Sequence, residues 1–238
     1  MVEPVRLKLL MLHGWTQCAS SFAFRCKAFE RRLQDCATLT FLDAPHVLSS
    51  DASLPDTSRA WFSRNSQTGE YVGWNDSRRM IAACWERDGP FDAICGFSQG
   101  AVALHQLLVD LSESDAEAES NTLAPLLASP PSCVILVCGF PSRHGITPTE
   151  GMENVDVLPP GAKPLHIPAL HVMAENDTIV PLVAQRALYA RWSNGSAQAL
   201  MTDRGHSMPQ RSADMTVVAD FLRDHSRLRR AAATAPIA

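Results

Sequence analysis

The pentapeptide Gly-Phe-Ser-Gln-Gly at positions 96–100 constrains the fold more than any other part of the chain. It directly follows the apolar run Phe91–Cys95, and its last two residues open the apolar stretch Gln99–Leu111. A serine with glycine two residues away on both sides is typical of a sharp strand-to-helix turn, because side chains at those positions would collide with it. Such a turn exposes the hydroxyl at the carboxyl edge of a sheet. The pattern favours Ser98 as a nucleophile over a plain tight turn.

The rest of the chain alternates short apolar runs with longer amphipathic ones, which is typical of βαβ units around a parallel sheet. With 238 residues, 46% of them hydrophobic, the chain can bury a substantial core, and we expect one domain over residues 1–238. About six mainly parallel strands are predicted in the spatial order 2-1-3-4-5-6, with helices on both faces, as in the α/β-hydrolase fold. The expected strands are Leu7–Leu12, Thr38–Leu42, Phe91–Cys95, Cys133–Cys138, Ala169–Met173 and Ala197–Thr202.

Helical spacing of apolar residues predicts the elements between these strands. The expected helices are Ser20–Leu33, Asp76–Arg87, Gln99–Leu111, Leu182–Trp192 and about Pro209–Arg223. Three segments break the pattern. Residues 112–121 form an acidic run without large apolar residues and predict a surface insertion, and residues 231–238 predict a frayed tail. Ser49–Trp74 is a long polar loop interleaved with aromatic residues, a type that is usually functional or disordered.

Composition argues against several classes of protein. The net charge is −4 and the basic residues occur in short clusters, so no nucleic-acid surface is expected. Seven single cysteines without a CxxC pair argue against a disulfide scaffold or a structural zinc site. No stretch reaches the roughly 20 apolar residues of a membrane span. The N-terminus is too short and too charged for a signal peptide, so we expect a cytoplasmic protein.

A serine needs a base to take its proton, and in this fold the acid and then the histidine follow the serine along the chain. His206 lies after the last predicted strand, at the sheet edge where open α/β sheets bind ligands. Asp177 follows the preceding strand and is the expected acid, which orients and stabilises the imidazolium. Glu175 and Asp203 are the alternatives.

An oxyanion hole requires two preorganised N–H donors. One is expected from the backbone of Gln99, directly after the nucleophile. The other is expected from the loop after the first strand, where Gly14 allows a close turn. The Trp15 amide is favoured there and the Thr16 amide is the alternative. No metal ion or cofactor is expected.

Five motifs together resemble the eukaryotic FSH serine hydrolase family, over a match from about Leu7 to Phe221. They are Leu-His-Gly-Trp (12–15), Ala-Pro-His (44–46), Gly-Pro-Phe-Asp-Ala-Ile-Cys-Gly-Phe-Ser-Gln-Gly (89–100), Cys-Gly-Phe-Pro (138–141) and Gly-His-Ser-Met-Pro (205–209). The resemblance implies the triad Ser98, Asp177 and His206 and a carboxylesterase-like activity without a cofactor. It also implies that Phe140 and the aromatic segment around Trp61 line an acyl pocket.

The leading function is hydrolysis of a small-molecule acyl ester through an acyl-enzyme. A thioesterase would use the same machinery, and a ligand-binding protein that keeps the hydrolase fold without turnover is the alternative from another class. The sequence does not indicate an oligomeric state. Trp61, Phe62 and Trp74 suggest a flexible aromatic rim that selects the acyl chain; the alternative is that they plug the loop onto the sheet.

Overall fold

The structure is a computed structural model that describes residues 6–48, 53–65, 67, 71–114, 122–142 and 163–225. Most of the acidic run predicted as an insertion at 112–121 lies outside the described residues, and so does the whole of the predicted tail at 231–238. None of the helices in the described ranges combines the length and the apolar composition that crossing a membrane requires.

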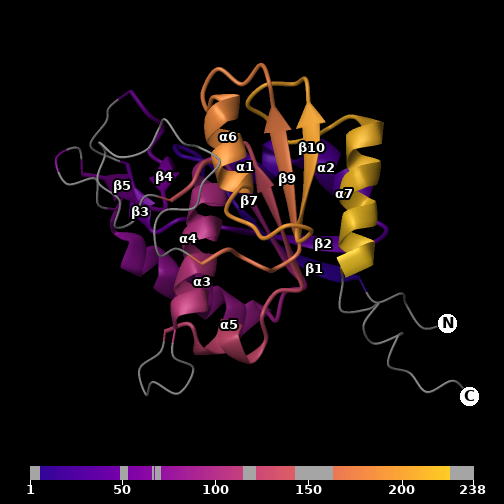
Figure 1. Ribbon diagram of the computed structural model, residues 1–238. Helices are drawn as coiled ribbons and strands as arrows, with labels where there is room; N and C mark the ends of the chain where they lie inside the picture. The colour runs from indigo at the N-terminus through magenta and orange to yellow at the C-terminus, as the bar shows by residue number, and fades with distance from the viewer. Residues whose placement is uncertain are drawn as a thin grey trace, which may run out of the picture.

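A six-stranded parallel sheet forms the centre of the molecule (Figure 1). Its strands, in spatial order, are β10 (Ala197–Thr202), β9 (Ala169–Ala174), β8 (Cys133–Val137), β7 (Ala93–Phe97), β1 (Leu7–Leu12) and β2 (Ala37–Leu42). Every residue of β7, β8 and β9 is buried, as expected for parallel strands with helices on both faces. The predicted fold class and strand order are therefore confirmed.

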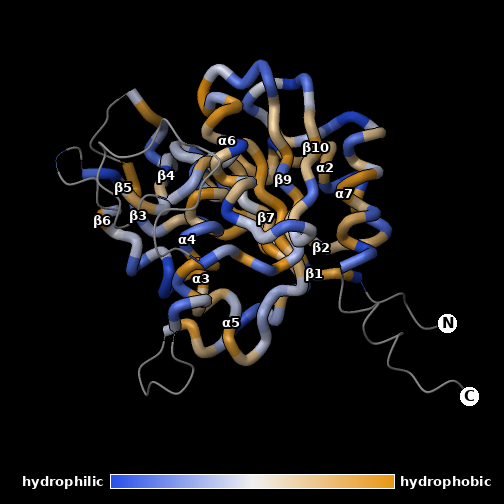
Figure 2. The backbone as a smooth tube through the Cα atoms, viewed as in Figure 1, coloured by the Kyte–Doolittle hydropathy of each residue, from blue (hydrophilic) through white to orange (hydrophobic). Residues whose placement is uncertain are grey.

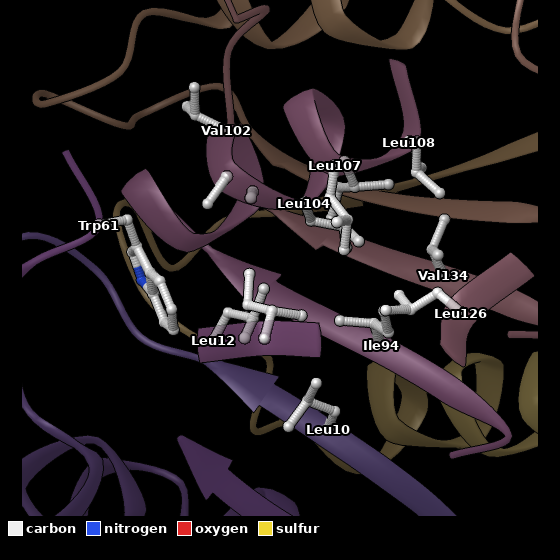
Figure 3. Packing of buried hydrophobic residues seen from close by; sticks show 14 of the residues in the cluster. Leu10, Leu12, Trp61, Ile94, Val102, Leu104, Leu107, Leu108, Leu126 and Val134 are labelled. Carbon is white, nitrogen blue, oxygen red and sulfur yellow. The ribbon is translucent and has the colours of Figure 1, made fainter. Parts of the chain in front are cut away.

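Seven helices of the described chain cover the two faces, each against its own core (Figures 1 and 2). On one face lie α1 (Ala19–Arg25), α2 (Lys27–Leu33) and α7 (Ser212–His225), which bury Phe22, Phe29 and Leu222. On the other lie α3 (Trp74–Asp88), α4 (Gln99–Glu113), α5 (Ala124–Ala128) and α6 (Leu182–Tyr189). Figure 3 shows this second core, in which Leu104 and Leu107 of α4 lie over Leu12 and Ile94 of the sheet.

Two predicted boundaries differ from the observed ones for physical reasons. The predicted strand Phe91–Cys95 is displaced by two residues, because Phe91 packs against Trp85 of α3 at a ring separation of 5.3 Å before the strand begins. The predicted helix Ser20–Leu33 is two helices, interrupted at Cys26, whose backbone (φ −89°, ψ 4°) leaves the helical region. The Cys26 N–H donates to two carbonyls, those of Phe22 and Ala23, as in a tightened last turn.

The loop expected at Ser49–Trp74 is more structured than predicted where it is described. Two antiparallel pairs of very short strands lie in and beside it. They are β3 (His46–Val47) with β4 (Arg59–Ala60) and β5 (Ser63–Arg64) with β6 (Tyr71–Val72). The pairing fastens this segment over the α3 and α4 side of the sheet instead of leaving it as an open loop.

Two histidines lie inside the core next to α6. His105 of α4 and His171 of β9 are both buried, and burial lowers the pKa of each to about 3. The His171 ring meets Trp192 edge-on at 4.5 Å. Its Nε2 atom has no hydrogen-bond partner among the described residues. Both side chains therefore stay neutral in the folded protein at neutral pH.

These buried histidines should make the protein acid-sensitive. In the unfolded chain a histidine has a pKa of about 6.5, so below that pH the unfolded state binds protons that the folded state excludes. Each histidine then lowers the free energy of unfolding by about 1.4 kcal/mol per pH unit, down towards the folded pKa of about 3. His171→Phe keeps the ring contacts but has no group to protonate. Between pH 6.5 and 5, we expect its free energy of unfolding to fall by about 2 kcal/mol less than that of the wild-type protein. Urea unfolding at both pH values measures this difference, and parallel losses would contradict it.

Candidate active site

Ser98 occupies a strained turn between β7 and α4. Its backbone has φ +52° and ψ −118°, a conformation that non-glycine residues seldom adopt. A Cβ atom at Gly96 would collide with the Gly100 carbonyl, and one at Gly100 would collide with the Leu12 carbonyl at the end of β1. The two glycines thus allow the turn to close and let α4 begin against β1. This is the geometry that the sequence predicted for the turn.

The Ser98 hydroxyl begins a line of hydrogen-bonded side chains from three loops. Its Oγ lies 3.0 Å from Nε2 of His206, and Nδ1 of the same ring lies 2.7 Å from Oδ2 of Asp177. Asp177 follows β9 and His206 follows β10, so the three groups meet at the carboxyl edge of the sheet. The structure brings together the three residues that the sequence selected, with the imidazole between the hydroxyl and the carboxylate.

The Asp177 carboxylate is enclosed, with a side-chain exposure of 0%. Burial alone would raise its pKa, but hydrogen bonds outweigh this and lower the pKa below its usual value. Its Oδ1 accepts the N–H groups of Val180 and Ile179, both at 2.8 Å, while Oδ2 faces His206. The Gln185 amide lies 3.3 Å from Oδ2. Asp177 therefore stays ionised and keeps one oxygen directed at the imidazole.

The alternative acids lie outside this line. Glu175 is exposed, and the Asp203 carboxylate is also exposed and forms an ion pair with Arg211 at 2.5 Å. Only the backbone of Asp203 approaches the site, where its carbonyl accepts the side-chain amide of Asn176 at 2.7 Å. The geometry therefore favours Asp177 over both.

Sequence reasoning assigned no role to Cys138, which lies close to the Asp177–His206 pair. Its thiol is 3.8 Å from the Gly205 carbonyl and 3.9 Å from that of Ser207, on either side of His206. Burial, together with the nearby Asp177 charge, raises its pKa to about 12, so it packs as a neutral thiol. The Asp177 and His206 atoms that face each other form a 2.7 Å hydrogen bond, and the neutral Cys138 thiol is not in the thiolate form that binds zinc.

Backbone strain collects around this site. Among the described residues, the non-glycine positions with positive φ are Thr16 (+64°), Ser98 (+52°) and Cys138 (+49°). Thr16 belongs to the loop after β1, and the other two follow neighbouring strands. Strain of this kind persists only where surrounding contacts enforce it, and it clusters at functional sites. The positive φ at Cys138 could not be predicted from the sequence, because a glycine follows it and a positive φ is expected at the glycine instead.

The backbone amides near Ser98 separate into used and available donors. The Thr16 N–H donates to the Arg59 carbonyl at 3.0 Å, so it is not available to a substrate oxygen. In the described part of the chain, the N–H groups of Trp15 and Gln99 donate to no protein acceptor. Trp15 therefore remains the candidate in the loop after β1, and Gln99 the candidate after the nucleophile.

The three residues that suggested an aromatic rim are buried. Trp61, Phe62 and Trp74 are 0%, 4% and 4% exposed and belong to the core on the α3 and α4 side. Figure 3 shows Trp61 in this core. The Trp61 indole N–H donates to the His13 carbonyl at 2.8 Å, and that of Trp74 to Asp110 at 2.8 Å. Because these polar atoms are satisfied inside the protein, the rings can be fully buried. This burial agrees with the alternative, in which these residues pack the segment onto the sheet. Phe140 is half-buried against the same core, and its place in an acyl pocket stays a prediction.

The family described as serine hydrolase (FSH1) matches residues 1–218 of this chain. The chain belongs to this family. The esterase OVCA2 of Danio rerio is 28% identical over 245 residues, covering 93% of this chain and 99% of that protein. The esterase CG5412 of Drosophila melanogaster is 26% identical over 230 residues, covering 92% and 74%.

Solved esterases share the fold of this FSH1 family member. The crystal structure of esterase PE8 superposes with a TM-score of 0.58 at 16% identity and covers 93% of both chains. A carboxylesterase from Mesorhizobium loti gives a TM-score of 0.57 at 18% identity and covers 93% of this chain and 90% of that one. The sequence resemblance to the FSH serine hydrolases is thus confirmed, and the α/β-hydrolase fold with it.

Exchange of the acid provides the first test of the site. Asp177→Asn keeps the shape of the side chain but favours the wrong histidine tautomer, so we expect ester hydrolysis to fall by about 10⁴-fold. The matched control is Asp203→Asn, which removes an exposed carboxylate and should leave kcat/KM near wild type. Steady-state rates with a p-nitrophenyl ester measure both. A large loss in the Asp203 variant with near-normal rates in the Asp177 variant would reverse the assignment.

Truncation of the buried Trp61 side chain tests whether it packs the segment onto the sheet or selects the acyl chain. We expect Trp61→Ala to destabilise the protein by about 3–5 kcal/mol, as for other buried aromatic truncations, and to lower the melting temperature. Any loss of rate should be the same for acetate and for long-chain p-nitrophenyl esters. A steep loss confined to long acyl chains, at an unchanged melting temperature, would instead support the rim.

Proposed function

We propose that this protein hydrolyses small-molecule carboxylic acyl esters through an acyl-enzyme on Ser98. The observation that carries the proposal is the line of contacts of 3.0 Å and 2.7 Å from the Ser98 hydroxyl through His206 to a buried, ionised Asp177. Membership of the FSH1 serine hydrolase family and the similarity to proteins named esterases support the same reaction.

In the first half-reaction, His206 Nε2 takes the Ser98 proton as Oγ forms a bond to the ester carbonyl carbon. The carbonyl oxygen becomes an oxyanion, which the N–H groups of Trp15 and Gln99 bind. Collapse of this intermediate breaks the bond to the alkoxy oxygen, and the proton on His206 passes to that oxygen as the alcohol leaves. Asp177 remains ionised throughout and stabilises the imidazolium.

In the second half-reaction, a water molecule replaces the alcohol. His206 takes one of its protons as the water oxygen attacks the acyl carbon, and the second oxyanion collapses by expelling Ser98 Oγ. The proton returns from His206 to the serine, and the carboxylic acid is released. Every proton is taken and returned by His206, so the cycle balances with water as the co-reactant.

Removal of the hydroxyl tests the proposal. Ser98→Ala should lower ester turnover by at least about a thousandfold while leaving the fold intact, and should abolish labelling by a serine-directed fluorophosphonate. Ser112→Ala, at an exposed serine near the other end of α4, is the matched control and should be labelled and active.

Two results would contradict the proposal. Turnover that persists in Ser98→Ala would place the nucleophile elsewhere. Wild-type protein that binds an ester or an acyl-CoA without steady-state turnover would point to a ligand-binding role for this fold.

A further inference from the structure

The side chain of Gln99 is hydrogen-bonded at both ends to a distant piece of backbone. Its Oε1 accepts the Trp61 N–H at 3.0 Å, and its Nε2 donates to the Phe62 carbonyl at 2.8 Å. The partners are 38 and 37 residues away in the sequence. A primary amide is well suited to this contact, because it offers one acceptor and one donor side by side to a peptide that presents one of each. The residue after the nucleophile is thus tied to residues 59–62, here called the 59–62 segment.

The same segment also holds the loop after β1, which carries the other candidate oxyanion donor. The Arg59 carbonyl accepts the Thr16 N–H and the Arg59 N–H donates to the Gln17 carbonyl, both at 3.0 Å. The Trp61 indole N–H donates to the His13 carbonyl at 2.8 Å. These three bonds attach the loop immediately before and after Trp15.

The 59–62 segment has its own anchors in the core. The Ser77 hydroxyl of α3 donates to the Trp61 carbonyl, and the Arg59 guanidinium donates to the Ala44 carbonyl at 3.1 Å. The Trp61 ring is fully buried and packs on His13 at 5.2 Å. The segment is therefore a fixed part of the protein, to which two otherwise separate loops are attached.

We infer that Gln99 is a positioning residue. Through the 59–62 segment, its side chain sets the separation between the backbone N–H groups of Trp15 and Gln99. The inference rests on the proposed function. It names the group that preorganises the oxyanion hole, which requires donors about 2.7–3.1 Å from the developing oxyanion. Both loops contain a strained residue, Ser98 on one side and Thr16 on the other, and strain persists only under restraint. Misplacement by about 1 Å can lower the rate by 10²-fold.

Two variants of Gln99 test this inference. Gln99→Met has similar length but neither hydrogen bond. Gln99→Glu keeps the acceptor for the Trp61 N–H but places a second acceptor against the Phe62 carbonyl. For both we expect kcat to fall about 10- to 100-fold with KM within twofold of wild type, because the lost interaction acts on the transition state. The matched control is Gln106→Met, a buried glutamine two turns along the same helix whose amide donates to Asp110, and it should keep wild-type kcat.

A second measurement separates positioning from a merely structural role. A trifluoromethyl ketone forms a tetrahedral adduct with an active serine and places an oxyanion in the hole. Its inhibition constant should rise in the Gln99 variants by the same factor by which kcat/KM falls. Loss that only tracks a lower melting temperature, or weaker substrate binding with unchanged kcat, would overturn the inference. Should Gln99→Met not fold, Gln99→Glu decides alone.

The outcomes also separate this inference from the proposed function. If wild-type turnover depends on Ser98 but the Gln99 variants match wild type in kcat and in inhibition by the ketone, the positioning role is wrong and the ester hydrolysis stands. If turnover does not depend on Ser98, the proposed function itself is wrong.

Discussion

Helix α4 begins directly against the carboxyl end of β1, and only a residue without a Cβ atom fits at the contact. Gly100 touches the carbonyls of Leu12 and His13, and Gly96 lies against Gly100 on the other side of the turn. This close approach puts the first amide of α4 beside the loop that leaves β1. The other parts of the site are arranged around that contact: His206 and Asp177 arrive from β10 and β9, and the 59–62 segment covers the junction from the α3 side.

His13 shows how a buried polar group supports this arrangement without taking part in chemistry. Burial lowers its pKa, so the ring stays neutral and its two nitrogens have different roles. Nε2 accepts the Ala44 N–H at 3.0 Å, which leaves the proton on Nδ1 to donate to the Gly14 carbonyl at 2.8 Å. The ring therefore fixes the turn at Gly14 from which the Trp15 amide is presented. A charged imidazolium could not accept from Ala44, so neutrality is a structural requirement here.

The sheet order and the position of Ser98 were predictable because they follow from local rules. Buried parallel strands read as apolar runs, and a serine between two glycines at a strand-to-helix junction specifies its own turn. Asp177 and His206 were predictable as polar residues at strand ends, and the distances then favoured the expected Asp177 over Asp203. The burial of Trp61 was not predictable, since it depends on a carbonyl at His13 that lies 48 residues away in the sequence. The positive φ of Cys138 and the break at Cys26 had no local signal either.

The contacts that define the site close long stretches of chain. Ser98 and His206 are separated by 108 residues, His206 and Asp177 by 29, and Trp61 and Gln99 by 38. Topologies dominated by such distant contacts fold slowly, because chain entropy is lost before the contacts form. The contact between Ser98 and His206 cannot form until β10, the strand that precedes His206, has joined the sheet. During refolding, recovery of an activity that depends on these contacts should therefore trail the recovery of helical content, which would make that activity a sensitive reporter of the final native state.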